Sequence, residues 1–145
     1  MYLTRHSDYS LRVLMFLAVK GDELATVPQI TQAYGISRGH LMKVVQNLGR
    51  LGYVKTLRGR GGGITLGAPP STIRLGAVVR QTEENLDLVE CFAARESGCR
   101  IQPVCRLQGA IREALEAFLK VLDSYTLADM VSGRAAPLRR LLQLA

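Results

Sequence analysis

The sequence predicts a mainly α-helical protein with one small β-hairpin, and three observations indicate this fold class. Two short amphipathic segments are joined by a tight glycine turn, which is the helix-turn-helix pattern. A basic, glycine-rich hairpin follows them directly, as the wing does in a winged helix. Near the C-terminus, apolar residues recur in steps of three and four over three heptads. We therefore expect a winged helix-turn-helix DNA-binding domain followed by a long C-terminal dimerisation helix.

The composition is that of an ordinary globular protein. Of the 145 residues, 48% are hydrophobic and 21% are charged, so a sizeable core is expected and extensive disorder is not. No run approaches the roughly 18 apolar residues that would span a bilayer. The first ten residues also lack the basic-then-apolar pattern of a signal peptide. We therefore expect a cytoplasmic protein without a membrane partner.

Positive charge is concentrated in the first part of the chain. Residues 1–80 carry eleven Lys and Arg against three Asp and Glu, whereas residues 81–145 carry eight against nine. So uneven a charge distribution favours binding of the basic part to a polyanion. The alternative is a basic surface that is merely solvated. The charge distribution thus agrees with DNA binding by the N-terminal part.

The first three predicted helices build the helix-turn-helix domain. Segment 8–20 has one apolar face, and Ser7 or Asp8 would cap its start. The second segment covers 27–34 and follows a threonine cap. After a tight glycine turn, the third segment starts at a serine cap and reaches about residue 51.

The polar face of the third segment carries the residue types that contact DNA. Arg, Lys, Gln and Asn donate hydrogen bonds to phosphates and to base edges in the major groove. On an isolated helix such a face would more simply be solvated, but the helix-turn-helix context favours DNA. The candidate DNA-contacting residues here are Ser37, Arg38, His40, Lys43, Gln46 and Asn47.

Residues 53–66 predict the hairpin, with strands over 53–57 and 64–66. Its loop places arginines among four glycines, which lets backbone approach a phosphate closely. The loop lacks the G-x-x-x-x-G-K-[ST] spacing of a nucleotide-binding loop, and a plain flexible hairpin is the alternative. As a wing, it would contact DNA through Arg58, Arg60, Gly61 and Gly62.

The C-terminal half predicts a long helix with two apolar stripes. A short helix over 76–83 comes first, and an irregular segment separates it from the long helix, expected over 103–125. One stripe can pack on the protein's own body and the other on a second copy, or the helix can be a single buried core helix. The first stripe is Val104, Leu107, Ile111, Ala114, Phe118, Val121 and Tyr125, and the second is Leu115, Leu119 and Leu122.

All three cysteines, Cys91, Cys99 and Cys105, lie within one stretch of fifteen residues. This stretch covers part of the irregular segment and the expected start of the long helix. Thiolates bind soft metals and iron–sulfur clusters, but a cluster commonly takes four protein ligands, so one position stays unfilled. We expect Cys105 in the first turn of the long helix, where the helix dipole favours the thiolate. From the residues alone, a cluster, a structural zinc site, a thiol redox switch and inert cysteines all remain open.

No catalytic arrangement is visible in the sequence. The two histidines, His6 and His40, are far apart, and no Ser/His/Asp set or carboxylate pair can be argued. A redox enzyme that used the thiols would need a base, a cofactor motif or a C-x-x-C pair. We therefore expect a protein that is not an enzyme.

Six stretches carry a resemblance to a known family. They are MYLTRHSDYSLRVL, YGISRGHLMKVVQNLGRLGYV, RGRGGGITLG, RLGAVVRQTE, PVCRLQGAI and SYTLADMV. Through them the chain resembles the NsrR–IscR (Rrf-type) family of winged-helix transcription regulators over nearly its full length. Gln108 stands where cluster-biogenesis members have a histidine, which favours the nitric-oxide-sensing branch. The seven residues between Cys91 and Cys99 form a longer gap than the family pattern has.

The resemblance implies a homodimeric repressor of nitric-oxide detoxification genes that binds a palindromic double-stranded operator. It implies one iron–sulfur cluster per subunit, held by Cys91, Cys99 and Cys105, with 4Fe–4S favoured and 2Fe–2S possible. It also implies that Asp8 of the partner subunit completes the coordination. Nitric oxide would then release Asp8 to pair with Arg12 of its own helix, four residues away.

The alternative is a winged-helix regulator that senses thiol oxidation or cluster status. In either case the expected division is a DNA-binding domain over 1–83, a cluster-binding loop over 84–103, and a dimerisation helix with a C-terminal segment over 104–145.

Overall fold

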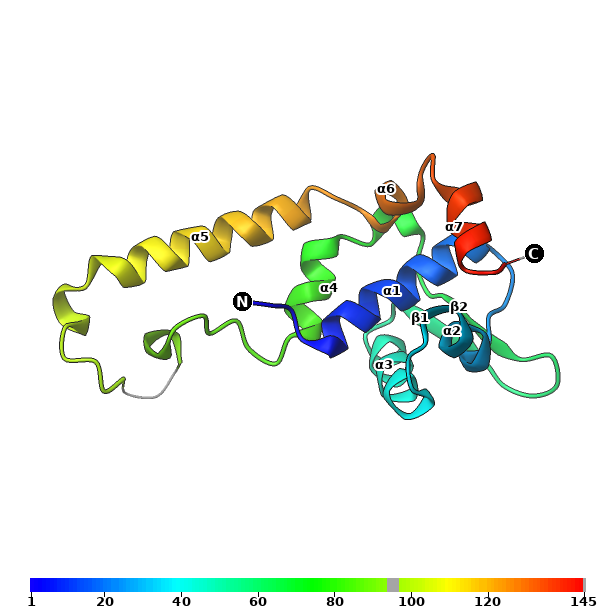
Figure 1. Ribbon diagram of the computed structural model, residues 1–145, viewed down its shortest axis with the longest axis horizontal. Coiled ribbons are helices and arrows are strands. Elements are labelled where there is room, and N and C mark those ends of the chain that lie inside the picture. Colours follow the sequence, from blue (N-terminus) through cyan, green and yellow to red (C-terminus); the bar gives the residue numbers. More distant parts are fainter. Residues whose placement is uncertain (94–96, 145) are drawn as a thin grey trace.

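Helix α1 (Arg5–Lys20) is the centre of the folded body, and the other elements surround it (Figure 1). The structure, a computed structural model, describes residues 1–93 and 97–144. Val13, Leu14 and Phe16 of α1 are fully buried. The helix contacts the second helix of the helix-turn-helix, the β-hairpin and the C-terminal helices alike. The core of the protein is therefore built around this one helix.

The start of α1 differs from the prediction. Thr4 caps the helix, because its Oγ1 accepts from the backbone N–H of Ser7 at 3.2 Å. Neither Ser7 nor Asp8 acts as the cap, so that prediction was wrong. The reason is a long-range contact: the backbone N–H of Thr4 donates to Glu83 Oε1 at 2.8 Å, which fixes Thr4 in the capping position.

The helix-turn-helix pair forms as predicted from α2 (Val27–Tyr34) and α3 (Arg38–Arg50). Thr26 and the third residue of α2 form a reciprocal capping box. Gly35 ends α2 with a φ of 65°, a left-handed conformation that glycine adopts without strain. Ser37 caps α3. These local signals make the two helices predictable from sequence alone.

The wing is an antiparallel pair of β1 (Val54–Leu57) and β2 (Gly63–Leu66). One connection was not predicted. Ala25, just before α2, pairs with Ile64 through two backbone hydrogen bonds of 2.9 and 2.7 Å. A Cβ on Gly63 would lie 2.6 Å from the Ala25 carbonyl oxygen, so this approach requires glycine. The wing is thereby attached to the helix-turn-helix.

An ion pair joins α4 (Leu75–Thr82) to the end of α5 (Arg106–Asp123). The Arg80 guanidinium donates to both oxygens of Asp123, at 2.6 and 2.7 Å. This hydrogen bonding lowers the pKa of Asp123 and raises the pKa of Arg80. A Cβ on Gly76 would collide with the Asp123 carboxylate. A side chain at residue 76 would therefore displace the Asp123 carboxylate from its place beside Arg80.

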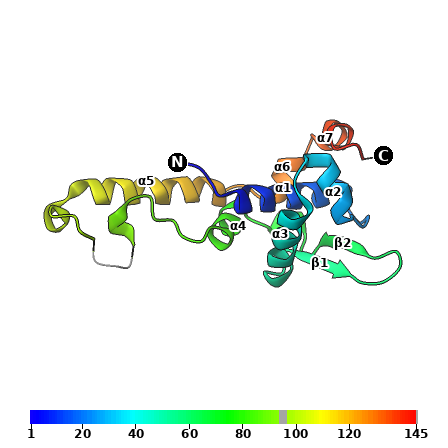
Figure 2. The same ribbon diagram turned by 60° about the horizontal axis from the view of Figure 1, so that its bottom comes forward.

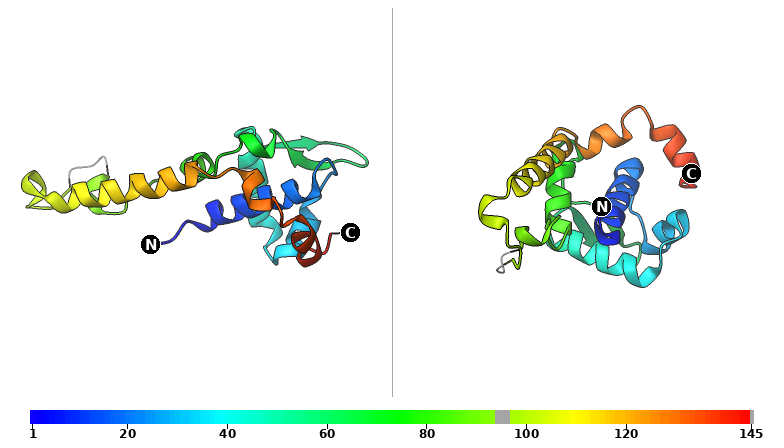
Figure 3. Two further views of the ribbon diagram at one scale, coloured as in Figure 1. Left: turned by 90° about the horizontal axis from the view of Figure 1, so that it is seen from above. Right: turned by 60° about the vertical axis from the view of Figure 1, so that its left-hand side comes forward.

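Helix α5 is only partly packed on the body. Leu119, of the second predicted stripe, is buried, whereas Leu107 and Val121 of the first stripe are 64% and 58% exposed. The N-terminal half of α5 extends away from the body, opposite to the direction of the wing (Figure 3). The first stripe is thus largely uncovered in the single chain.

The remaining elements are short. In the part of the chain that the structure describes, 3₁₀ turns occur at Pro70–Thr72, Glu90–Phe92 and Gln102–Val104. The C-terminal part adds α6 (Leu127–Val131) and α7 (Ala135–Leu141). Within the described residues, no helix is long and apolar enough to cross a membrane.

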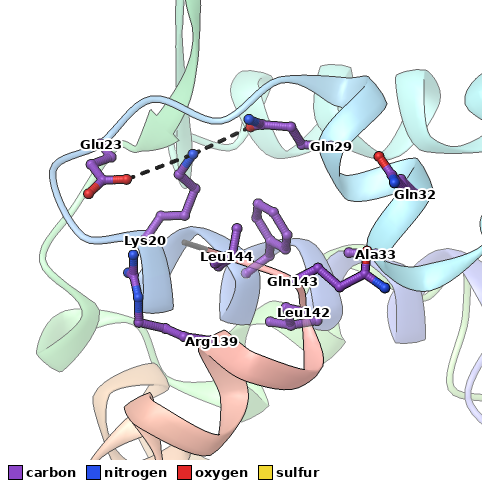
Figure 4. A pocket seen from close by; sticks show the side chains of 10 residues that line it. Lys20, Glu23, Gln29, Gln32, Ala33, Arg139, Leu142, Gln143 and Leu144 are labelled. Carbon is purple, nitrogen blue, oxygen red and sulfur yellow. Dashed lines mark hydrogen bonds and ion pairs between the residues drawn. The ribbon is translucent and has the colours of Figure 1, made fainter.

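The C-terminal tail, for which the sequence suggested no role, packs on α1. Leu142 is only 8% exposed and joins the main core. Arg139 Nη1 donates to the backbone carbonyl of Val19 at 3.0 Å. A cavity of about 260 Å³ lies between α1, α2 and α7 (Figure 4). At its edge, Lys20 Nζ lies 3.4 Å from Gln29 Oε1. The tail therefore completes the body beside the helix-turn-helix.

Replacing Leu142 with alanine should destabilise the protein by about 2–3 kcal/mol, because it removes a buried side chain and leaves a cavity. The matched control is Leu141→Ala, since Leu141 is 74% exposed and its loss should cost less than about 0.5 kcal/mol. Urea unfolding followed by circular dichroism measures both. Equal stabilities of the two variants would show that the tail does not contribute to the core.

Candidate nucleic-acid interface and cysteine segment

Helix α3 and the β1–β2 wing lie next to each other on one side of the body (Figure 2). On α3, the side chains of Arg38, Lys43 and Gln46 are exposed, and Ser37 is exposed at its start. Charged and amide groups on such a surface can donate to phosphates and base edges. Four of the six predicted α3 residues are therefore exposed on the surface.

The other two, His40 and Asn47, are half-buried and contact α1. The His40 ring meets the Tyr9 ring edge-on at 4.7 Å. Asn47 Nδ2 lies 3.0 Å from His6 Nε2. Burial, and secondly the charge of His40, lowers the pKa of His6. These two α3 residues thus connect the recognition helix to the centre of the protein.

One exposed α3 side chain escaped the sequence prediction. Met42 is 49% exposed on the same helix. A search for polar DNA-contacting residues passes over it, yet an apolar side chain can contact the methyl group of thymine. Only the three-dimensional structure places it on the exposed face rather than in the core.

The wing loop presents Arg58 and Arg60, both of which are exposed. Gly61 is also exposed and has a φ of 71°, whereas Gly62 is half-buried. The Gly62 N–H donates to the carbonyl of Gly59 at 3.1 Å, which closes the loop. The arginines are therefore presented from a turned loop, at the end of the wing.

Asp8 and Arg12 form the ion pair that their spacing predicted. Arg12 Nη2 lies 2.8 Å from Asp8 Oδ2, and both side chains are more than 40% exposed, at 44% and 43%. The Arg12 guanidinium also lies over the Tyr9 ring, 5.7 Å from its centroid. The Tyr34 hydroxyl donates to the Arg12 carbonyl at 3.0 Å, and burial raises the pKa of Tyr34 to about 12. The Asp8 carboxylate thus remains accessible at the surface.

The three cysteines carry free thiols. Residues 91–93 and 97–105, called the cysteine segment below, lie beside the half of α5 that extends away from the wing (Figure 1). Cys91 and Cys105 are half-buried and Cys99 is exposed. Cys105 occupies the N-cap position of α5, so its predicted place in the first turn was wrong by one residue. The 3₁₀ turn before it, in which the Cys105 N–H donates to the carbonyl of Gln102 at 3.3 Å, delays the α-helix.

Two contacts tie the ends of the cysteine segment together. Gln108 Nε2 donates to the backbone carbonyl of Cys91 at 3.1 Å. The Arg112 guanidinium lies over the Phe92 ring, 4.7 Å from its centroid. Both partners on α5 are far in sequence from the residues they hold. The first cysteine is thereby kept beside the helix that starts after the last one.

The long gap between Cys91 and Cys99 includes residues 94–96, which lie outside the described residues. Among the residues that are described, no three His, Cys, Asp or Glu side chains converge to hold a metal ion.

Residues 3–133 match the Rrf2 family model, which is described as an iron-dependent transcriptional regulator. The chain belongs to the Rrf2 family. An HTH-type transcriptional regulator, NsrR, from Geobacillus kaustophilus is 56% identical to this Rrf2 chain over 99% of the chain and 97% of the relative. NsrR from Bacillus subtilis is 54% identical over 92% of each.

Solved structures agree with this family and fold. CymR, the global cysteine regulator of B. subtilis, is 30% identical and aligns with a TM-score of 0.70 over 91% of this Rrf2 chain and 97% of its own. IscR of T. potens is 23% identical and aligns with a TM-score of 0.72 over 92% of this chain and 88% of its own. This is a likeness of fold alone. The prediction of a winged-helix transcription regulator of this family is confirmed, and the individual DNA-contacting residues stay predictions.

Replacing Arg60 with alanine should weaken operator binding about fivefold and reduce the slope of log affinity against log salt by about one, because one phosphate contact is lost. Arg140→Ala is the matched control, since it removes the same charge from exposed α7 on the other side of the body. Fluorescence anisotropy at several salt concentrations measures both variants. An unchanged slope for Arg60→Ala would exclude this wing contact.

Proposed function

We propose that this Rrf2 chain is a cytoplasmic, nitric-oxide-responsive repressor that holds one iron–sulfur cluster per subunit. The observation that carries the proposal is the set of three free thiols on one short segment at the end of α5. The relatives named NsrR, at about half identity or more over nearly the full chain, support it further. The proposed division of labour is DNA binding by 1–83, cluster binding by 84–103 and dimerisation by 104–145.

The donor set fits a cluster. Thiolates are the usual ligands of iron–sulfur clusters, and Cys91, Cys99 and Cys105 would hold it. The Gln108 hydrogen bond keeps Cys91 close to the start of α5, where Cys105 lies. When bound, the cluster would supply iron that reacts with nitric oxide and that accepts one further protein ligand. Three thiols leave that position to another residue, for a 4Fe–4S cluster above all.

The exposed apolar stripe of α5 supports a homodimer. Val104 is 84% exposed and Leu107 64%, and such surface is costly to leave in water. A cavity of about 540 Å³, lined mainly by apolar groups from the N-terminus, residues 83–88 and α5, lies beside the stripe. Two copies related by a two-fold axis would cover the same stripe on each other. The dimer therefore completes the burial that the single chain leaves unfinished.

Asp8 of the partner subunit is the proposed fourth ligand. The cysteine segment lies at the end of α5 that is remote from the body of its own chain (Figure 1). If the two α5 helices pair in antiparallel orientation, each cysteine segment approaches the other subunit's body. The exposed carboxylate of Asp8 is available there. Each cluster site would thus be shared between two chains.

Exchange of Asp8 between two partners is the proposed switch. In one state its carboxylate reaches the cluster segment of the other subunit and fixes the spacing of the two α3 helices on a palindromic operator. In the other state it pairs with Arg12, as in the single chain. A bias of a few kcal/mol between these arrangements is enough to regulate binding.

The alternative is a regulator that senses thiol oxidation without a metal. CymR, with which this chain shares its fold, has been solved in an oxidised form from Staphylococcus aureus, at 26% identity. Anaerobic purification separates the two proposals. Brown protein with iron and acid-labile sulfide excludes a metal-free thiol sensor, whereas colourless, iron-free protein with reversible disulfides excludes the cluster.

Operator affinity of the cluster-loaded protein should fall roughly five- to 150-fold on titration with nitric oxide, the usual range of allosteric coupling. Anaerobic anisotropy with the operator of a nitric-oxide detoxification gene measures the change. Cluster-free protein treated in the same way is the control and should not respond. An equal affinity before and after nitric oxide would exclude the sensor.

Asp8→Ala should change the absorption spectrum of the reconstituted cluster and the amount of nitric oxide needed to release DNA, because one ligand is removed. Asp22→Ala is the matched control, since Asp22 is an exposed carboxylate just after α1. Identical spectra and titrations for Asp8→Ala and the wild type would remove Asp8 from the ligand set.

A further inference from the structure

The first turn of α1 is bonded to two parts of the protein. These are residues 82–83, which precede the segment 84–103, and helix α3. On one side, the backbone N–H and Oγ1 of Thr4 both donate to Glu83 Oε1, at 2.8 and 3.0 Å. Beside them, Thr82 Oγ1 donates to Ser7 Oγ at 2.8 Å in a buried contact. Residues 84–103 follow directly on Glu83. The first turn of α1 is therefore bonded directly to the residue that precedes that segment.

On the other side, the same turn holds α3 through a chain of two hydrogen bonds. His6 Nε2 lies 3.0 Å from Asn47 Nδ2, and Asn47 Oδ1 accepts from Arg50 Nη2 at 2.8 Å. A guanidinium can only donate, so the Asn47 oxygen faces Arg50 and its NH₂ group faces His6. His6 must then accept at Nε2, as a neutral imidazole with its proton on Nδ1.

Open space borders these hydrogen-bonded side chains. Thr4, His6, Asn47, Arg50 and Glu83 all line one cavity, of about 370 Å³. The side chains of Asn47 and Arg50 thus border open space, although α3 itself packs on α1. The acceptor on His6 helps to set the direction of the Asn47 amide, and through it the position of the exposed Arg50 side chain.

We propose that His6 is a positioning residue that transmits the state of the first turn of α1 to the DNA-reading face of α3 through Asn47 and Arg50. The inference rests on the proposed function, because it names the route by which the cluster segment alters DNA binding within one subunit. In this role the Asn47 amide serves the relay, and Arg50 is the group that it presents to DNA.

Three variants test the relay. His6→Leu removes the acceptor, whereas His6→Gln keeps one in its side-chain carbonyl, and Asn47→Ala removes the donor from the other side. Operator affinity is measured for each in cluster-loaded and cluster-free protein. The measured quantity is the operator affinity of the cluster-loaded protein divided by that of the cluster-free protein. His6→Leu and Asn47→Ala should each reduce this ratio about fivefold, as expected for one lost hydrogen bond. His6→Gln should restore the ratio.

The double variant decides whether the two residues act together. If they form one relay, His6→Leu with Asn47→Ala should lose no more than either single variant. Additive losses would overturn the relay. So would a loss confined to Asn47→Ala that relaxes the preference at one base pair, since Asn47 would then contact DNA itself. Should His6→Leu fail to fold, Asn47→Ala breaks the same bond from α3.

A control variant removes another hydrogen bond that involves neither α1 nor α3. The Tyr53 hydroxyl donates to Gln81 Oε1 at 2.6 Å, so Tyr53→Phe deletes one hydrogen bond between the wing region and α4. Its affinity ratio should equal that of the wild type, and a fivefold fall would overturn a route specific to His6.

Failure of the two proposals can be told apart. A wild-type ratio of one refutes the sensor, while non-additive affinities in the cluster-free double-variant cycle still support the relay. A wild-type ratio well above one that survives in His6→Leu refutes the relay and leaves the sensor intact.

Discussion

Burial of α1 on nearly all sides is the constraint on which the rest of the structure depends. The recognition helix, the wing, α4 and both C-terminal helices pack on it, and Val13, Leu14 and Phe16 have no exposed surface. A closely packed helix moves as a unit rather than deforming. Its first turn reaches the surface, with the Asp8 side chain 43% exposed and Thr4 bonded to Glu83. A displacement of that turn would therefore move α1 and, with it, the elements that pack on α1.

Helix α5 connects this rigid body to the cysteines in an unequal way. Its C-terminal end is fastened by the Arg80–Asp123 pair, which Gly76 makes sterically possible. Its N-terminal half is in contact mainly with the cysteine segment, through Gln108 and Arg112. The thiols therefore lie on an arm whose base is fixed and whose apolar side is uncovered. In a dimer, such an arm would bring the three thiols to the surface of the other subunit.

Local signals made the helix-turn-helix predictable, because caps such as Thr26 and Ser37 bond to residues three positions away. The failures share one cause, which is a partner distant in the sequence. Glu83 moved the cap of α1 to Thr4, Ala25 joined the wing, and Leu142 entered the core from a tail without a sequence signal. At the candidate site, residue type identified the three cysteines. Their assembly was not predictable, because the proposed fourth ligand belongs to a second chain.

The uncovered stripe of α5 also has a consequence for how much protein a cell needs. In the dimer proposed above, the apolar surface of α5 leaves water only on association, so folding and assembly are linked by mass action. Thermal stability should then rise with protein concentration, and operator occupancy should vary with the square of the subunit concentration when dimers are scarce. The amount of the regulator in the cell would then affect transcription as strongly as the chemical signal does.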